Sequence, residues 1–228
     1  MNQPIVQSSD GITLVGGGPV SGRDLRFALS RAPVAVAADS GADRLLRAGI
    51  APEAVIGDFD SLSDTARRAV PADRQHPMAE QSTTDFDKAL RSVSAPFVLA
   101  LGFAGARIDH GLSVFNTLVR RIGQPGPVPP CIVLGPADIV FAAPAVVELR
   151  MRVGERLSLF PFAPVTGTSD GLEWPIGGLH FAPDGQIGTS NRVVVSQVRL
   201  RFDRPGMLVI LPRGRLDMVI SALTSARR

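Results

Sequence analysis

The chain has 228 residues, of which 45% are hydrophobic and 20% charged, so its length permits one large domain or two small ones with a buried core. No apolar run is long enough to cross a membrane, and the first ten residues lack a basic start and an apolar stretch. We therefore expect a cytoplasmic protein with no membrane association. The net charge of +3 and the scattered arginines argue against a nucleic-acid partner. A single cysteine, Cys131, cannot form an internal disulfide, and its apolar neighbours indicate a buried strand residue.

The first half of the chain alternates short apolar runs with helical patterns, which is typical of an α/β domain. Ser21 with Asp24 resembles a capping box, Thr84 and Asp87 can cap another helix, and Asp109 is expected to cap the last one. The predicted strands cover residues 12–15, 34–38, 55–56 and 97–101, and the predicted helices cover residues 21–29, around 45–48, 64–70, 84–90 and 109–122.

The pattern changes after the proline- and glycine-rich residues 123–130. Residues 147–153 and 198–202 alternate apolar with polar side chains, as strands with one wet face do, and residues 207–211 are typical of a buried strand. Turn clusters separate these runs. The predicted fold is an α/β domain with a mostly parallel sheet at residues 1–130, followed by a small all-β, sandwich-like domain at residues 131–228.

Polar clusters follow several of the predicted parallel strands where each strand ends. Because the carboxyl ends of parallel strands meet at one edge of a sheet, these side chains are expected to converge there. Clustered carboxylates repel one another unless a cation lies among them, and oxygen ligands without histidine or thiolate suit Mg²⁺. An acidic turn remains an equally good explanation of Asp58-Phe59-Asp60, in which an extended backbone would place both carboxylates on one side. The residues concerned are Asp39, Asp58, Asp60, Asp85, Arg107 and Asp109.

The segment 82–88 places hydroxyls and a carboxylate at a helix start, where free N–H groups favour phosphate oxygens, although capping alone explains it equally well. Lys88 is the only lysine among 24 basic residues, which indicates that an ammonium is needed there. Residues 16–18 are three glycines that could let a phosphate approach, but they lack the remaining residues of a P-loop and are better explained as a tight turn.

The order of these motifs resembles the thiamine pyrophosphokinase family. The first half carries ADSGADRL at residues 38–45, IGDFDS at 56–61, TDFDKAL at 84–90 and GARIDH at 105–110, and the second half adds GLEW at 171–174 and GTSN at 188–191. The resemblance implies an enzyme that transfers a pyrophosphoryl group from ATP to the hydroxyl of thiamine, giving thiamine diphosphate and AMP, with Mg²⁺. It also implies a homodimer in which the α/β domain of one subunit and the β domain of the other enclose each active site.

The resemblance also implies roles for single residues. The metal ligands would be Asp58, Asp60 and Asp85, which with Arg107 and Asp109 form the catalytic set. The substrate-binding set would be Asp39, Thr84 and Lys88 near the nucleotide, and Trp174, Ser190 and Asn191 at thiamine. A tryptophan face suits a cationic aromatic ligand, although a core tryptophan is the alternative. The general base is left open between Asp85, Asp109 and a metal-assisted attack without one.

Two residues depart from the family's pattern. Ser40 and Ala106 stand where glycines are usual, and both add bulk beside the expected ligand. Two other functions are also compatible with the residues: a pyrophosphokinase acting on a different alcohol such as a pterin, and a non-catalytic nucleotide- or thiamine-binding module.

Overall fold

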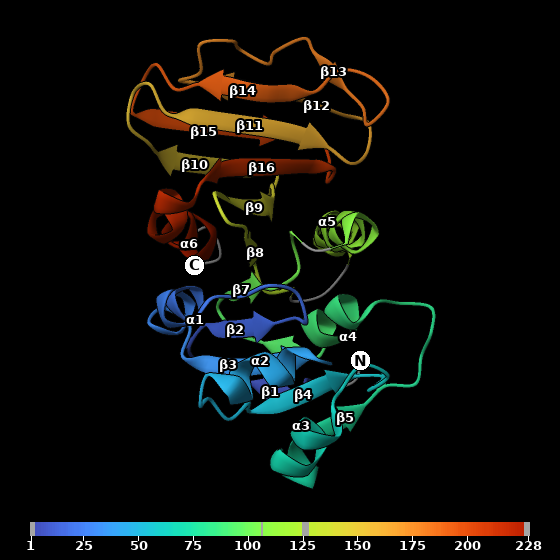
Figure 1. Cartoon of the computed structure of the whole chain (residues 1–228). Helices are drawn as coiled ribbons and strands as arrows, with labels where there is room; N and C mark the ends of the chain where they lie inside the picture. The colour runs from blue at the N-terminus through green and yellow to red at the C-terminus, as the bar shows by residue number, and fades with distance from the viewer. Residues whose placement is uncertain (1–2, 106, 125–127, 226–228) are drawn as a thin grey trace. The chain divides into compact units, whose positions relative to one another are not determined.

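The computed structural model describes residues 3–105, 107–124 and 128–225. The chain divides into two compact units (Figure 1). The first unit comprises Met1–Val114 and Pro127–Leu134, and the second comprises Phe115–Gly126 and Gly135–Arg228.

The first unit is built on a parallel sheet. Its strands run in the order β8-β7-β2-β3-β4-β5, and every neighbouring pair among them is parallel. The predicted, mostly parallel sheet is therefore confirmed. A separate short parallel pair is formed by β1 and β6. The strands are β1 Val6–Gln7, β2 Ile12–Val15, β3 Val34–Ala38, β4 Ala54–Gly57, β5 Gln75–Pro77, β6 Val93–Ser94, β7 Val98–Leu101 and β8 Cys131–Leu134.

Helices begin close to the predicted positions. Ser21 and Asp24 form a complete capping box, and Thr84 caps its helix by accepting from the backbone N–H of Asp87. The prediction that Asp109 caps the last helix is wrong, because that helix begins at Ile108 and Asp109 lies in its first turn. The helices are α1 Gly22–Leu29, α2 Gly41–Arg47, α3 Asp64–Ala69, η1 Ala72–Arg74, α4 Asp85–Arg91 and α5 Ile108–Ile122.

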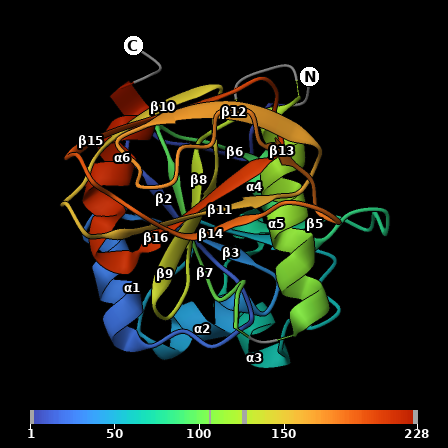
Figure 2. The ribbon, with the colours of Figure 1, turned by 90° about the horizontal axis from the view of Figure 1, so that it is seen from above.

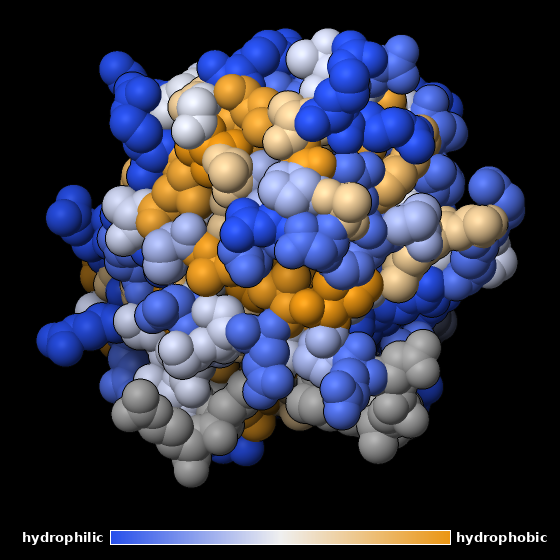
Figure 3. Space-filling model, turned by 90° about the horizontal axis from the view of Figure 1, so that it is seen from below, coloured by the Kyte–Doolittle hydropathy of each residue, from blue (hydrophilic) through white to orange (hydrophobic). Residues whose placement is uncertain are grey.

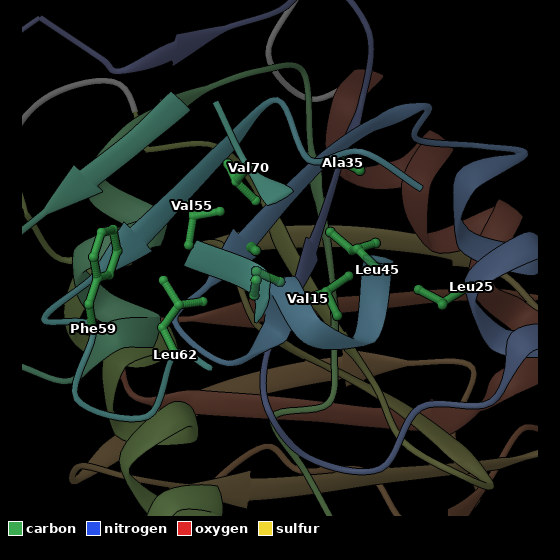
Figure 4. Packing of buried hydrophobic residues seen from close by; sticks show 11 residues of the cluster. Val15, Leu25, Ala35, Leu45, Val55, Phe59, Leu62 and Val70 are labelled. Carbon is green, nitrogen blue, oxygen red and sulfur yellow. The ribbon is translucent and has the colours of Figure 1, made fainter. Parts of the chain in front are cut away.

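The core of the first unit lies on the sheet. Val15 and Val55 point to the face on which Leu25, Leu45 and Val70 pack (Figure 4). Adjacent strand residues point to the opposite face and are also buried, because side chains alternate along a strand and helices cover both faces. This rigid sheet fixes the positions at which its loops begin.

The second unit is antiparallel. One group of strands has the order β14-β11-β16-β9 and the other has the order β10-β15-β12-β13. The predicted β-rich second half is confirmed, although residues 131–134 form β8 of the parallel sheet in the first unit. The strands are β9 Asp138–Ala142, β10 Val146–Arg150, β11 Arg156–Pro161, β12 Val165–Asp170, β13 His180–Phe181, β14 Gly188–Arg192, β15 Gln197–Phe202 and β16 Met207–Pro212.

Two details of the second unit differ from the sequence analysis. Strand β10 ends at Arg150; the predicted alternation of buried and exposed residues continues through Met151, but Val153 lies in a turn with 65% of its surface exposed. A short 3-10 turn, η2 Arg213–Arg215, leads into an unpredicted helix, α6 Leu216–Ser225. Helix α6 packs beside β10 (Figure 2).

The surface is mixed in character. Figure 3 shows one face on which apolar residues form an area framed by hydrophilic ones, as is common on folded proteins. None of the described helices has both the length and the hydropathy needed to span a bilayer.

Candidate active site

A pocket of about 390 Å³ opens at the carboxyl edge of the parallel sheet in the first unit. It is lined by the loops that follow β2, β3, β4 and β7, and by the first turns of α4 and α5. Ligands bind at this edge in open parallel sheets because the loops there diverge to leave a crevice. The strand ends that were expected to converge therefore do so.

Glycines allow two of these loops to meet. A side chain at Gly18 would place its Cβ 2.6 Å from the carbonyl oxygen of Gly102, and one at Gly41 would lie 1.9 Å from that of Val15. The N–H of Gly16 donates to Leu101 and that of Gly18 to Gly102. The backbone thus uses the donors of Gly16 and Gly18, but all three glycines line the pocket, so whether a phosphate approaches them stays a prediction.

Asp39 is the most deeply buried carboxylate of the pocket. It is 3% exposed, its Oδ2 accepts from the Ser61 hydroxyl at 2.9 Å, and its Oδ1 has no hydrogen-bond partner. Burial raises the pKa of Asp39 to about 6, with Asp60 and Asp85 adding to the rise and Ser61 opposing it. Sequence reasoning missed Ser61, whose only signal is its place in the same loop.

Asp58 and Asp60 reach the same pocket edge by a turn. The expected extended backbone is wrong here, because Phe59 has a φ of 64°, in the left-handed region. The Phe59 ring is buried in the core, and Arg67 donates to the Phe59 carbonyl at 3.2 Å. The N–H of Asp60 donates to Asp58 Oδ1 at 3.3 Å, which keeps the two side chains together.

Asp39, Asp58 and Asp60 fit a cation. One ligand oxygen from each lies within 4.8 Å of the others, and this is the group of potential metal ligands found among the described residues. The donors are oxygen only, and the buried Oδ1 of Asp39 needs a partner. These properties suit Mg²⁺. The group thus contains two of the three predicted ligands, Asp58 and Asp60, together with Asp39, which the resemblance placed beside the nucleotide; the third predicted ligand, Asp85, is not part of it.

Asp85 faces the same pocket from the first turn of α4. Its Oδ1 accepts from Lys88 Nζ at 3.1 Å, and Asp58 Oδ2 accepts from the same nitrogen at 3.0 Å. Burial alone would lower the pKa of Lys88, but its bonds to the two carboxylates raise it. Burial would likewise raise the pKa of Asp58, but the hydrogen bond and charge of Lys88 together with the bond from the Asp60 N–H hold it below the ordinary value. The sequence contains a signal for the Asp85–Lys88 ion pair, because residues three apart on a helix are neighbours.

Arg107 and Asp109 form an exposed ion pair at the start of α5. Arg107 Nη2 donates to Asp109 Oδ2 at 2.6 Å, and Arg107 also lines the pocket. The hydrogen bond from Arg107 lowers the pKa of Asp109 to about 2, with help from the N–H of His110. The pair is therefore charged at neutral pH.

Ser40 and Ala106 are the two residues that depart from the family's pattern. Ser40 lines the pocket, and a Cβ built on Gly17 would lie 2.3 Å from its hydroxyl oxygen, so Ser40 fills space beside the glycine loop. Its side chain does not cap α2. Ala106 lies outside the described residues. Whether either residue changes substrate affinity stays a prediction.

The candidate residues of the second unit also come together. Trp174 donates its N–H to Asn191 Oδ1 at 3.3 Å, and Asn191 Nδ2 returns a bond to the Trp174 carbonyl at 2.7 Å. Asn191 is buried, whereas 57% of Trp174 is exposed, so the alternative of a core tryptophan is wrong. Ser190, with a φ of 60°, is held by a bond from its N–H to the Ser158 hydroxyl at 2.9 Å. Asn191 thus fixes the backbone from which the indole projects.

A parallel sheet with a helix start and an acidic group that could hold a metal ion at its carboxyl edge is compatible with the class of enzymes that transfer phosphate groups. Two family models match this chain in tandem. The catalytic domain of thiamin pyrophosphokinase matches residues 25–125, and the vitamin B1 binding domain of thiamin pyrophosphokinase matches residues 146–207. The chain belongs to the thiamin pyrophosphokinase family, whose members use ATP, and its activity is the transfer of a pyrophosphoryl group to thiamine.

Individual relatives are similar to this chain over most of its length. A thiamine pyrophosphokinase of Bacillus subtilis (strain 168) is 26% identical over 211 residues, covering 88% of this chain and 97% of the relative. The crystal structure of thiamine pyrophosphokinase from Bacillus subtilis has a TM-score of 0.69 at 22% identity, covering 89% of this chain and 98% of that one. The thiamin pyrophosphokinase structure from Candida albicans has a TM-score of 0.73 at 16% identity, covering 93% and 95%. At these identities the two structures show the shared fold.

Proposed function

We propose that the carboxylate cluster of the first unit binds Mg²⁺ together with the phosphates of ATP. The observation that carries this proposal is the convergence of Asp39, Asp58 and Asp60, whose ligand oxygens lie within 4.8 Å of one another around a buried, unpartnered Oδ1. Asp85 would complete the set from the first turn of α4, where Thr84 caps the helix. When bound, the cation would neutralise negative charge on the transferred phosphate oxygens.

The two parts of the chain divide the work in this proposal. Residues 1–130 form the nucleotide- and metal-binding catalytic domain, and residues 131–228 form the thiamine-binding and dimerisation domain. The family models for a catalytic and a vitamin B1 binding domain support this division. Asp39 and Thr84 would lie beside the nucleotide, and Lys88 would act in the same region through its two carboxylate partners.

The reaction proposed is an in-line attack of the thiamine hydroxyl on the β-phosphorus of ATP, with AMP as leaving group. The chain's own residues would contribute by orienting the two substrates and by stabilising charge that develops on the transferred group. Arg107 suits the second task because it lines the pocket. Asp109 is a poor proton acceptor in the free protein because Arg107 lowers its pKa to about 2, so we assign it the role of holding Arg107. The proton of the thiamine hydroxyl would then be accepted by Asp85, or the hydroxyl would attack without a side-chain base.

The thiamine site is proposed to comprise Trp174, Ser190 and Asn191. The exposed indole supports this role, since a flat π face attracts a cationic aromatic ring, and the bonds from Asn191 hold it in place. A pterin is a less suitable acceptor because the second family model is specific for vitamin B1.

We further propose a homodimer in which Trp174 of one subunit completes the site that contains Asp58 of the other. A mixing experiment tests this arrangement at thiamine concentrations well below KM. Asp58→Asn protein should be inactive alone, and Trp174→Ala protein should keep at most about a tenth of wild-type activity at these concentrations, but together they should regain about a quarter. The reason is that about half of randomly exchanged dimers are mixed, and each mixed dimer has one intact site.

A control must establish that subunits exchange, for example by native mass spectrometry of two isotope-labelled batches. If mixed dimers form and no activity returns, both sets of residues belong to one chain and the shared site is wrong.

The cytoplasmic location expected from the sequence also stays a prediction, which microscopy of the full chain fused to a fluorescent protein would test.

A further inference from the structure

Lys88 occupies an unusual position for its residue type. Lysine side chains are almost never fully buried unless they are paired, yet Lys88 is only 1% exposed and is among the largest fully buried side chains of the chain. It is also the single lysine among 24 basic residues. A buried ammonium must have partners that offset the cost of removing it from water.

Those partners come from two different elements. Asp85 lies one turn earlier on α4, and Asp58 lies in the loop after β4; the two carboxylates receive bonds from Nζ at 3.1 and 3.0 Å. A compact ammonium can donate in both directions from one point, whereas an arginine fork is larger and planar. Among the described residues Lys88 is the one buried basic side chain, and a point charge there suits the two carboxylates better than an arginine fork would.

We propose that Lys88 is a positioning residue that holds Asp58 and Asp85 together and keeps the carboxylate cluster assembled when no divalent cation is bound. This inference rests on the proposed Mg²⁺ site. Without the ammonium, Asp39, Asp58, Asp60 and Asp85 would leave their mutual repulsion uncompensated until a cation arrived. Lys88 thus makes the empty site stable and presents a preformed pocket edge to the nucleotide.

The hydrogen-bond donors that contact the carboxylates of the cluster support this role. Lys88 uses one oxygen of Asp58 and one of Asp85, the Asp60 N–H uses the other oxygen of Asp58, and Ser61 uses one oxygen of Asp39. Each of these contacts orients a carboxylate, but Lys88 alone among them brings a positive charge. Removing it should therefore have a consequence that depends on whether another cation is present.

The test is thermal unfolding of the full-length protein at one fixed ATP concentration, first with excess EDTA and again with saturating Mg²⁺, because Mg²⁺ is expected to bind mainly together with ATP. Lys88→Met should lower Tm by roughly 10 °C without the cation, because it leaves two partly buried carboxylates without their partner. Added Mg²⁺ should restore at least half of that loss, and should raise the Tm of the variant more than that of the wild type. Leu90→Ala, a buried change on the same helix, is the matched control and should lose the same Tm in both conditions.

A second variant separates charge from packing. Lys88→Met combined with Asp85→Asn removes one of the repelling charges, so it should be more stable without cation than Lys88→Met alone. This comparison also applies if Lys88→Met by itself does not fold, since the double variant should then recover a folded protein. If Lys88→Met behaves like Leu90→Ala and Asp85→Asn gives no rescue, Lys88 only fills space and the inference is wrong. If Mg²⁺ stabilises neither the wild type nor any variant, even with ATP present, the proposed metal site itself fails.

Discussion

Replacing Asp39 with asparagine should stabilise the metal-free protein at alkaline pH. Asparagine keeps the shape of the side chain and can accept the Ser61 hydrogen bond, and it tolerates the φ of 46° at this position. The substitution therefore removes the buried charge and little else. If the amide oxygen keeps the bond from Ser61, the amide nitrogen takes the place of Oδ1, the oxygen that has no hydrogen-bond partner in the wild type.

The magnitude follows from the pKa of Asp39, which is raised from 3.8 to about 6. A raised carboxyl pKa means that the folded state binds a proton more readily than the unfolded state, so wild-type stability rises as pH falls through 6 towards 4. At pH 8 the ionised carboxylate costs the folded state at most about 3 kcal/mol, since each pKa unit corresponds to about 1.36 kcal/mol. Asp39→Asn should be more stable by up to that amount at pH 8, and its advantage should vanish near pH 4.

Urea unfolding of EDTA-treated protein at pH 8, 6 and 4.5 measures this difference. Far-UV circular dichroism is the suitable signal, because the single tryptophan, Trp174, lies in the second unit and would report on the wrong part of the chain. Asp184→Asn, at an exposed turn, is a control that should change little at any pH. A gain that is absent at pH 8, or that is equal at all three pH values, would refute the assignment of a buried, unpartnered charge to Asp39.

Four further results are expected. Asp58→Asn or Asp60→Asn should lower kcat by orders of magnitude, because each removes a proposed metal ligand; Tm should change little for Asp60→Asn, whereas Asp58→Asn also loses a charge partner of Lys88, and full activity in both would contradict the metal assignment. Trp174→Ala should raise the thiamine KM by roughly tenfold or more and leave ATP binding unchanged, whereas an equal effect on both substrates would argue against stacking on thiamine. Thr84→Ala should destabilise the first unit by about 1 kcal/mol or less through loss of a long capping bond, measured by urea unfolding; no change would mean that the cap contributes nothing. Mg²⁺ should bind mainly together with ATP in calorimetric titrations, and tightly held Zn²⁺ in the purified protein would contradict the oxygen-ligand site.

The periodic elements of this fold could be predicted from the sequence because local pattern and tertiary structure agree. Buried parallel strands such as residues 34–38 appear as continuous apolar runs, and the alternation at residues 198–202 matches a strand with one buried face. Helix α6 was missed because Leu216–Ser225 mixes apolar and β-branched residues without strong start or stop signals.

The geometry of the site could be predicted only in part. Convergence of the carboxylates follows from the parallel sheet, but the left-handed backbone of Phe59 does not follow from any local rule. Such a conformation is costly for a bulky residue and persists here because its ring is buried with Leu62 and Val70. The burial of Lys88 was equally hidden, since the segment 84–90 alone is compatible with a solvated lysine.

The central claim concerns the group that is transferred, and product analysis tests it most directly. The purified chain is incubated with ATP, Mg²⁺ and thiamine, and in parallel with a pterin alcohol, and nucleotides and thiamine esters are separated by chromatography. The account predicts AMP and thiamine diphosphate in equal amounts, with no thiamine monophosphate intermediate and no AMP release with the pterin. Formation of ADP with thiamine monophosphate, or AMP release that does not depend on thiamine, would contradict it.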